Sequence, residues 1–159
     1  MIRAVTTFFG VGLLPMAPGT FGSLAALPFG LLLTVWGGPL ALMLGAGCVF
    51  LLGLWATERH TKGGGDHDPS EIVIDEVVGQ WIAMAPLAMN IGFFGGDLFI
   101  DLFVNLGLSF VLFRVFDITK PFPVSSADLM ATPMGVMLDD VLAGIMAAIG
   151  LTALVAIFS

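Results

Sequence analysis

Two pairs of adjacent acids interrupt apolar stretches of the chain, Asp75-Glu76 and Asp139-Asp140. Carboxylates on helices in or near hydrocarbon are costly unless they are paired or bind a cation, so they indicate a functional site. Four carboxylates together form a hard, oxygen-rich site of the kind that Mg²⁺ prefers. The alternative is that they are solvated among the lipid headgroups or paired with nearby basic side chains. We predict that these four acids hold Mg²⁺ and are catalytic.

The residues before each acid pair indicate that both pairs enter the membrane from the same side. Pro69 and Pro133 each follow a residue that can cap a helix, a pattern typical of the first helical turn. Each acid pair begins six positions after its proline. The two pairs are therefore predicted at equal depth, about 10 Å along the axis from the helix start. Glu71 lies one turn before Asp75 and is either a further member of the site or only a capping acid.

A third polar group, Arg114, Asp117 and Lys120, is followed by Pro121. Spacing of three places the side chains along one helical stripe. Pro121 disfavours helix at Lys120, so the stripe is expected to end where the chain leaves the membrane. One interpretation is a self-neutralising series of salt bridges. We favour the other, in which Asp117 is a catalytic metal ligand, Arg114 and Lys120 bind phosphate oxygens, and Lys120 is also catalytic.

A fourth group lies in the Pro- and Gly-rich segment 14–23, directly before an apolar run. A helix N-terminus offers free N–H groups and the positive end of a dipole, which suit an anion. Gly19 and Gly22 allow the backbone to approach a phosphate closely, and Thr20 and Ser23 add hydroxyl groups. Such residues also start helices for structural reasons alone. We expect these four residues to bind the substrate phosphate.

The elements that position these groups are predicted from composition. Of 159 residues, 58% are apolar and 11% are charged, and the mean hydropathy is +1.05, whereas soluble domains carry about 25% charged residues. About 20 helical residues cross a bilayer. We therefore predict one domain over residues 1–159, an all-α, polytopic membrane bundle of about five transmembrane helices. The first two apolar runs form a hairpin that either spans or is re-entrant. The apolar runs are 22–37, 40–57, 72–94, 98–116 and 136–158.

All five Lys and Arg residues lie in or near segments 1–21, 58–71 and 117–135, and the turns at 38–39 and 95–97 have none. The positive-inside rule places these three polar segments in the cytoplasm. The chain has no basic tract, which argues against a nucleic-acid partner. The single Cys48 excludes an intrachain disulfide and a multi-cysteine metal site.

The two histidines, His60 and His67, lie beside a Gly-rich segment. We interpret them as solvated loop residues rather than metal ligands or general bases. A histidine-dependent membrane phosphatase requires a nucleophilic histidine among Arg and Lys clusters, which this pattern does not offer. A small transporter or channel using clustered intramembrane carboxylates is the main alternative function. The acids lie toward one face, however, and the middle of the last apolar run contains no ionisable residue.

Together these groups resemble the phosphatidylglycerophosphatase A family. The resemblance implies a magnesium-dependent hydrolase of the bacterial inner membrane, multi-pass, with its active site on the cytoplasmic side. Its phospholipid substrate would be phosphatidylglycerophosphate, whose terminal phosphate is removed to leave phosphatidylglycerol. The matching stretches are Leu14-Pro15-x-x-Pro18-Gly19-Thr20-x-Gly22-Ser23-Leu24-Ala25, Ile72-Val73-Ile74-Asp75-Glu76-Val77-Val78-Gly79-Gln80-Trp81-Ile82, Phe113-Arg114-x-Phe116-Asp117-x-x-Lys120-Pro121-x-Pro123 and Gly135-Val136-Met137-Leu138-Asp139-Asp140-x-x-Ala143-Gly144.

The chain departs from the family pattern at two places. Residues 131–134 replace a Gly-rich stretch, and Leu129 replaces a basic residue after Asp128. We therefore do not count Asp128 among the catalytic residues. One metal or two, direct attack by water or an aspartyl-phosphate intermediate, and the oligomeric state are all left open by the sequence.

Overall fold

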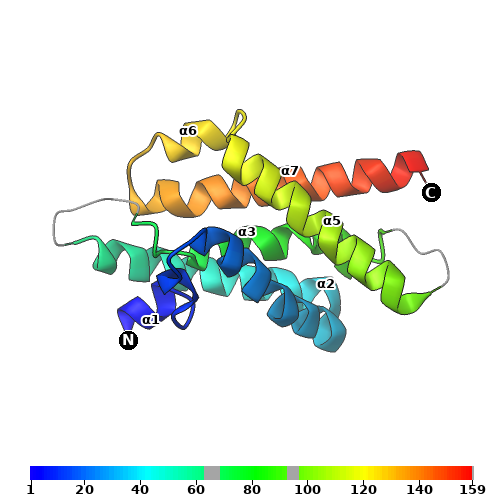
Figure 1. The fold of residues 1–159 in the computed structure, drawn as a ribbon, viewed down its shortest axis with the longest axis horizontal. Helices are drawn as coiled ribbons and strands as arrows, with labels where there is room; N and C mark the ends of the chain where they lie inside the picture. Colours follow the sequence, from blue (N-terminus) through cyan, green and yellow to red (C-terminus); the bar gives the residue numbers. More distant parts are fainter. Residues whose placement is uncertain (63–68, 93–96, 159) are drawn as a thin grey trace.

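The structure, a computed structural model, describes residues 1–62, 69–92 and 97–158, and every regular element in these residues is a helix (Figure 1). The expected all-α architecture is therefore confirmed. The elements are α1 (Ile2–Thr6), the 3₁₀ turn η1 (Val11–Leu13), α2 (Pro18–His60), α3 (Ile74–Ala83), α4 (Ala85–Ala88), α5 (Leu98–Thr119), α6 (Val124–Asp128) and α7 (Pro133–Phe158).

Helix α2 is a hairpin of two antiparallel arms, drawn in blue and cyan in Figure 1. Residues 18–37 form the first arm and residues 39–60 the second. They meet at Gly38, whose φ of 64° and ψ of −158° lie outside the helical region and are readily adopted by glycine. The arms pack closely, since a Cβ on Gly45 would lie 2.8 Å from Leu33 Cδ1. The predicted hairpin is confirmed.

Among the described residues, three helices are long and apolar enough to cross a membrane: the 43-residue α2, residues Phe99–Thr119 and α7. Each arm of α2 has about 20 residues, the length that a bilayer requires. The predicted run at 72–94 differs, because α3 has only 10 residues and the four-residue α4 follows it. In the described part of the chain, four long helical segments thus surround a short central helix, in place of five similar spans.

The helix predicted to start at Pro69 starts instead at Ile74. In a helix beginning at Pro69, the Val73 N–H would bond to the Pro69 carbonyl. It donates to the Thr6 carbonyl at 2.9 Å instead, and Val73, with a φ of −139° and a ψ of 11°, lies outside the helical region. The prediction for α7 holds, because that helix does begin at Pro133. The two acid pairs therefore lie at different distances from their helix starts, and the predicted symmetry is wrong.

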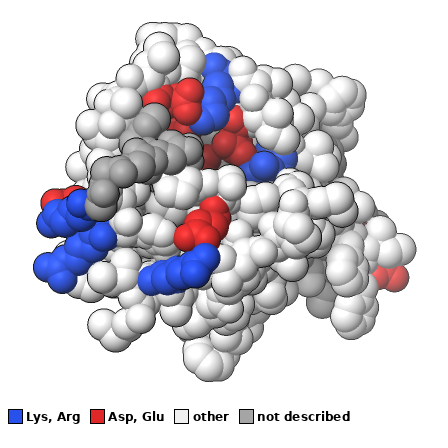
Figure 2. Space-filling view, turned by 60° about the vertical axis from the view of Figure 1, so that its left-hand side comes forward, with Lys and Arg blue, Asp and Glu red and all other residues white. Residues whose placement is uncertain are grey.

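The polar segments gather at one end of the bundle. Figure 1 shows the N-terminus, the end of α2, α6 and the start of α7 at this end, with the α2 hairpin turn and the C-terminus at the other. Basic and acidic side chains cluster here around a hollow in the surface (Figure 2). The described residues of segments 1–21, 58–71 and 117–135 therefore share one end of the bundle, which agrees with the prediction.

Helix α3 packs closely against both α7 and α2. A Cβ on Gly144 of α7 would lie 2.4 Å from the Gly79 carbonyl oxygen of α3, so only glycine allows this approach. Small residues bring membrane helices together in this way. On its other side, α3 is tied to α2 by a hydrogen bond of 2.8 Å from Trp81 Nε1 to the Ala26 carbonyl. The acid-bearing helices are consequently held against one another.

Candidate active site

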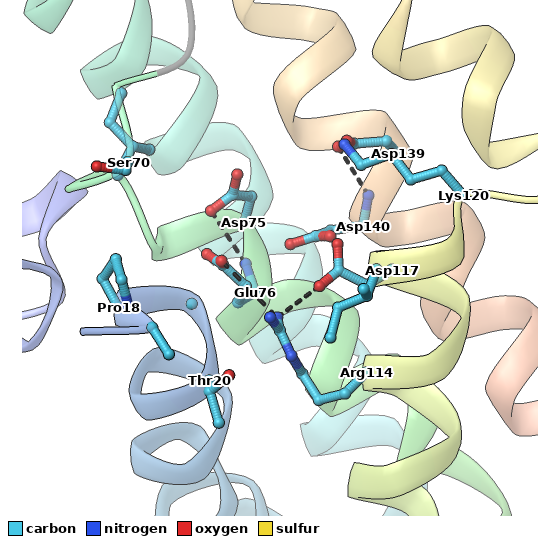
Figure 3. A pocket seen from close by; sticks show the side chains of 14 residues that line it. Pro18, Thr20, Ser70, Asp75, Glu76, Arg114, Asp117, Lys120, Asp139 and Asp140 are labelled. Atoms are coloured by element: carbon cyan, nitrogen blue, oxygen red, sulfur yellow. Dashed lines mark hydrogen bonds and ion pairs between the residues drawn. The ribbon is translucent and has the colours of Figure 1, made fainter.

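A cavity of about 420 Å³ opens at the polar end of the bundle (Figure 3). It lies between the start of α2, the start of α3, the end of α5 and the acid-bearing turn of α7. All the predicted site residues except Gly22 and Ser23 line it. The lining residues are Ala17, Pro18, Gly19, Thr20, Ser70, Ile72, Asp75, Glu76, Arg114, Asp117, Ile118, Lys120, Asp139 and Asp140.

Three carboxylates converge on one side of the cavity. One oxygen from each of Asp75, Glu76 and Asp140 lies within 4.8 Å of the other two. Asp75 and Asp140 are buried, and Glu76 Oε2 is buried without a hydrogen-bond partner among the described residues. An unpaired buried carboxylate oxygen is costly unless a cation or a proton satisfies it. An all-oxygen cluster with an unsatisfied buried oxygen fits a hard divalent cation.

Gly19 leaves room for one of these carboxylates. A Cβ at Gly19 would lie 2.0 Å from Glu76 Oε1 and 3.3 Å from Arg114 Nη1. Any side chain at this position would therefore displace Glu76. The glycine predicted to let a phosphate approach the backbone is also needed for the approach of α3 to the first turn of α2.

Arg114 occupies the centre of the site. Its Nη1 lies 2.5 Å from Asp117 Oδ2, 3.9 Å from Glu76 Oε1 and 3.5 Å from the Ser23 hydroxyl. The Arg114 side chain is 15% exposed, and its buried Nε has no hydrogen-bond partner in the described part of the chain. The guanidinium thus faces the cavity while carboxylates on two helices hold it in place.

Lys120, just past the end of α5, binds Asp139 and holds it away from the carboxylate cluster of Asp75, Glu76 and Asp140. Its Nζ donates to Asp139 Oδ2 at 2.7 Å and also to Asp128 Oδ1. Partial burial alone would lower the pKa of Lys120, but the hydrogen bonds to the two carboxylates raise that pKa well above its usual range. Lys120 therefore keeps its charge at neutral pH. Asp139 also accepts a hydrogen bond of 3.0 Å from the Asp140 N–H.

The two predicted phosphate-binding residues that do not line the cavity lie behind its wall. Ser23 is buried, and its hydroxyl donates to the Gly19 carbonyl at 2.8 Å. A Cβ at Gly22 would lie 2.8 Å from Val73 Cβ, so this glycine admits the segment before α3. Thr20 does line the cavity, beside the free N–H groups of the first turn of α2. Those N–H groups and the helix dipole suit an anion.

Sequence reasoning missed a second ionic cluster, in which Glu71 joins α1 and α2 near the cavity. Its carboxylate lies 2.7 Å from Arg3 Nη2 and 2.9 Å from His60 Nε2, and His60 Nδ1 is 2.8 Å from the Thr6 hydroxyl. The hydrogen bond from Arg3 is the main reason that the pKa of Glu71 is lowered. Glu71 is thus neither a member of the carboxylate cluster nor a helix cap. The partners are too far apart in sequence for any spacing pattern to have revealed them.

The prediction for the histidines is wrong for His60, which is the last residue of α2 and has a side chain only 17% exposed. His67 lies outside the described residues. Asp128, which we did not count as catalytic, lies at the rim as a partner of Lys120 and does not line the cavity.

Comparison with known proteins gives one consistent family. The model of the family described as "Phosphatidylglycerophosphatase A" matches residues 4–155. A phosphatidylglycerophosphatase A of Escherichia coli (strain K12) is 38% identical over 144 residues, which is 88% of this chain and 75% of that protein. One of Haemophilus influenzae is 39% identical over 150 residues, 93% of this chain and 85% of the relative.

A third relative carries a different name. A "Putative phosphatidylinositol-3-phosphatase" of Bacteroides thetaiotaomicron is 35% identical over 151 residues, covering 89% of this chain and 85% of that protein. No solved structure matches the chain.

Proposed function

The chain belongs to the phosphatidylglycerophosphatase A family, and we propose that it hydrolyses the terminal phosphomonoester of phosphatidylglycerophosphate to give phosphatidylglycerol and phosphate. The observation that carries the proposal is the cavity, in which three clustered carboxylates face an arginine and a lysine. Such a cavity suits a dianionic phosphate bound with a divalent cation. The family membership and the location of the clustered acids at one end of the bundle favour hydrolysis over ion transport.

We propose Mg²⁺ as the cation, held by Asp75, Glu76 and Asp140. Their clustered oxygens and the unpaired Glu76 Oε2 support this assignment. When bound, Mg²⁺ would neutralise negative charge on the phosphoryl oxygens and lower the pKa of a coordinated water. Glu76 Oε1 also lies 3.9 Å from Arg114 Nη1, so the proposed cation site is directly beside the proposed phosphate site.

Arg114 and Lys120 are the proposed phosphate ligands. Phosphoryl transfer requires that charge on the equatorial oxygens be neutralised while the nucleophile and leaving group stay in line. The Arg114 guanidinium is fixed by Asp117, which limits its motion and leaves its other donors available to a phosphate. Lys120 is held between Asp128 and Asp139, so its ammonium stays charged at the rim. The first turn of α2, at Gly19 and Thr20, supplies backbone donors opposite these cations.

We place the site on the cytoplasmic side of the bacterial inner membrane. All five Lys and Arg residues lie in or near the polar segments that gather at the site end of the bundle. A cavity at this end lies at the height of the lipid headgroups, where the phosphomonoester of a membrane lipid is found.

Phosphate release from defined lipids by the purified protein tests the proposal. The panel contains phosphatidylglycerophosphate, phosphatidylinositol 3-phosphate and phosphatidic acid in mixed micelles, each with Mg²⁺ or with excess chelator. We expect the highest kcat/KM on phosphatidylglycerophosphate, and only with Mg²⁺. A clear preference for phosphatidylinositol 3-phosphate would instead assign this chain the activity in the name of the Bacteroides relative.

A further inference from the structure

An apolar groove of about 390 Å³ lies between the first arm of α2 and α5. Its walls face the lipid, since Leu24 is 42% and Phe103 71% exposed. At Gly107 a Cβ would have no atom within 4 Å, so the groove is open at this point. The residues that define it are Leu24, Leu27 and Leu31 of α2, and Phe103, Gly107 and Phe110 of α5.

The groove and the active-site cavity follow one another along the same two helices. Helix α2 begins at the cavity with Gly19 and Thr20 and continues into the groove at Leu24. Helix α5 runs the other way, leaving the groove at Phe110 and reaching the cavity at Arg114. The Arg114 guanidinium, 3.5 Å from the Ser23 hydroxyl, therefore marks the boundary between the apolar groove and the polar cavity.

The distance from the cavity to the far end of the groove matches one lipid leaflet. From Thr20 to Leu31 the α2 axis advances about 16 Å at a rise of about 1.5 Å per residue. The hydrocarbon core is about 30 Å thick, so each leaflet contributes about half of that. An acyl chain whose headgroup is at the cavity would reach the end of the groove near the middle of the bilayer.

Two further apolar grooves among the described residues do not lead to the cavity. One lies between the second arm of α2, α3 and α7, around Gly47. Tight packing closes it toward the polar end, because a Cβ at Gly53 would lie 2.8 Å from Met137 Cε and 3.2 Å from Ile74 Cγ2. The other lies where α4 contacts the last turns of α7, at the far end from the acids.

We propose that one acyl chain of the lipid substrate lies in the α2–α5 groove while its phosphomonoester occupies the cavity, so that the substrate enters sideways between these two helices. This inference rests on the proposed function, to which it adds a binding subsite. Bulk lipid is as apolar as the groove, so the groove contributes little hydrophobic free energy. Its effect is orientation, because a chain fixed along α5 brings the phosphate to Arg114 in one direction.

Filling the groove tests the proposal. Phosphate release is measured on dipalmitoyl phosphatidylglycerophosphate and on its deacylated, water-soluble headgroup analogue. The kcat/KM for the lipid is divided by the kcat/KM for the headgroup analogue, and this ratio is compared between the wild type and each variant. In Gly107→Phe we expect this ratio to fall about tenfold, within the range by which fit in an apolar pocket discriminates substrates. Gly47→Phe is the matched control, since a Cβ at Gly47 also has no atom within 4 Å. Its side chain would fill the groove between α2, α3 and α7, which does not lead to the cavity. An unchanged ratio in Gly107→Phe, or an equal fall in Gly47→Phe, would overturn the proposal.

A second measurement tests binding of the acyl chain in the groove without relying on hydrolysis. It remains informative if the wild-type protein hydrolyses neither substrate, which is the result that would contradict the proposed function itself. A phosphatidylglycerophosphate with a diazirine in the middle of one acyl chain is photolysed with the full-length protein in nanodiscs. A phosphatidylcholine carrying the same diazirine reports contact with bulk lipid. We expect the phosphatidylglycerophosphate probe to label segments 24–31 and 103–110 more than the phosphatidylcholine probe does. Equal labelling of these segments by both probes would refute specific binding in the groove.

Discussion

The ammonium nitrogen of Lys120 lies 2.7 Å from Asp139 Oδ2, and this contact separates two acids that are adjacent in the sequence. Asp139 faces Lys120 at the rim, whereas Asp140 lies with the carboxylates of Asp75 and Glu76. We expected all four acids and Asp117 to hold metal. We now propose a smaller ligand set, because Asp117 and Asp139 each hold a basic residue.

Substitution of the two adjacent acids should therefore give different results. Asp140→Asn removes a proposed ligand and should abolish turnover at every Mg²⁺ concentration tested. Asp139→Asn loosens Lys120 and should lower kcat/KM by about 10–100-fold, the effect typical of residues that support a metal site from behind its ligands. It should leave the Mg²⁺ concentration for half-maximal activity close to that of the wild type. Magnesium titration of both folded variants is the measurement. Turnover by Asp140→Asn, or a large shift of the half-maximal Mg²⁺ concentration in Asp139→Asn, would contradict the division of roles.

Arg114→Ala should lower kcat/KM by about 10²–10³, or about 2.7–4 kcal/mol of transition-state stabilisation, because it removes a charged donor facing the phosphate. Arg114→Lys should recover only part of this loss, since an ammonium cannot reproduce the planar fork that also contacts Asp117. Arg59→Ala is the control. Arg59 lies over the Trp55 ring, 4.5 Å from its centroid, and does not line the cavity. Equal losses in Arg59→Ala and Arg114→Ala would point to a general effect of charge.

Gly19→Ala should lower kcat/KM by about 10²-fold, the scale of a misplacement of about 1 Å at a catalytic group. Its Cβ would lie 2.0 Å from Glu76 Oε1, so the carboxylate must move away from the cluster. Gly47→Ala, at a helical position with open space around the new Cβ, should keep wild-type activity. Steady-state kinetics and thermal unfolding of both variants provide the comparison. Wild-type kinetics in Gly19→Ala would show that the position of Glu76 is unimportant.

The orientation of the bundle can be tested with single cysteines in a Cys48→Ser background. The cysteines are introduced as Lys62→Cys, Ser126→Cys and Asp97→Cys. Lys62 and Ser126 lie at the site end, and Asp97, the N-cap of α5, lies at the other end. We expect a membrane-impermeant maleimide to label the first two only from the cytoplasmic side, and the third only from outside. Labelling of Lys62→Cys and Ser126→Cys from opposite sides would be incompatible with the fold.

Much of the fold could be predicted from the sequence because the apolar runs and the residues between them indicate where the long helices begin and end. The α2 hairpin at Gly38, the Asp97 cap of α5 and the start of α7 at Pro133 all follow from local rules on glycine, capping and apolar length. The short α3 could not be predicted in this way. Its start depends on a hydrogen bond from Val73 to Thr6, which are distant in sequence.

The composition of the cavity was predictable, but the pairing of its residues was not. Spacing along α5 placed Arg114, Asp117 and Lys120 on one stripe. It could not show that Asp117 pairs with Arg114 while Lys120 reaches across to Asp139 on α7. Such contacts depend on the angles between helices, which close approaches such as Gly79 against Gly144 determine.

The most direct test of the central claim measures both products of the proposed reaction in one assay. Wild-type protein and Asp140→Asn are reconstituted with phosphatidylglycerophosphate and Mg²⁺, and phosphatidylglycerol and inorganic phosphate are quantified over time. We expect the wild type to form the two products in equal amounts, chelator to stop the formation of both, and Asp140→Asn to form neither. Phosphatidylglycerol formation at the wild-type rate by folded Asp140→Asn would show that the carboxylate cluster is not the catalytic site.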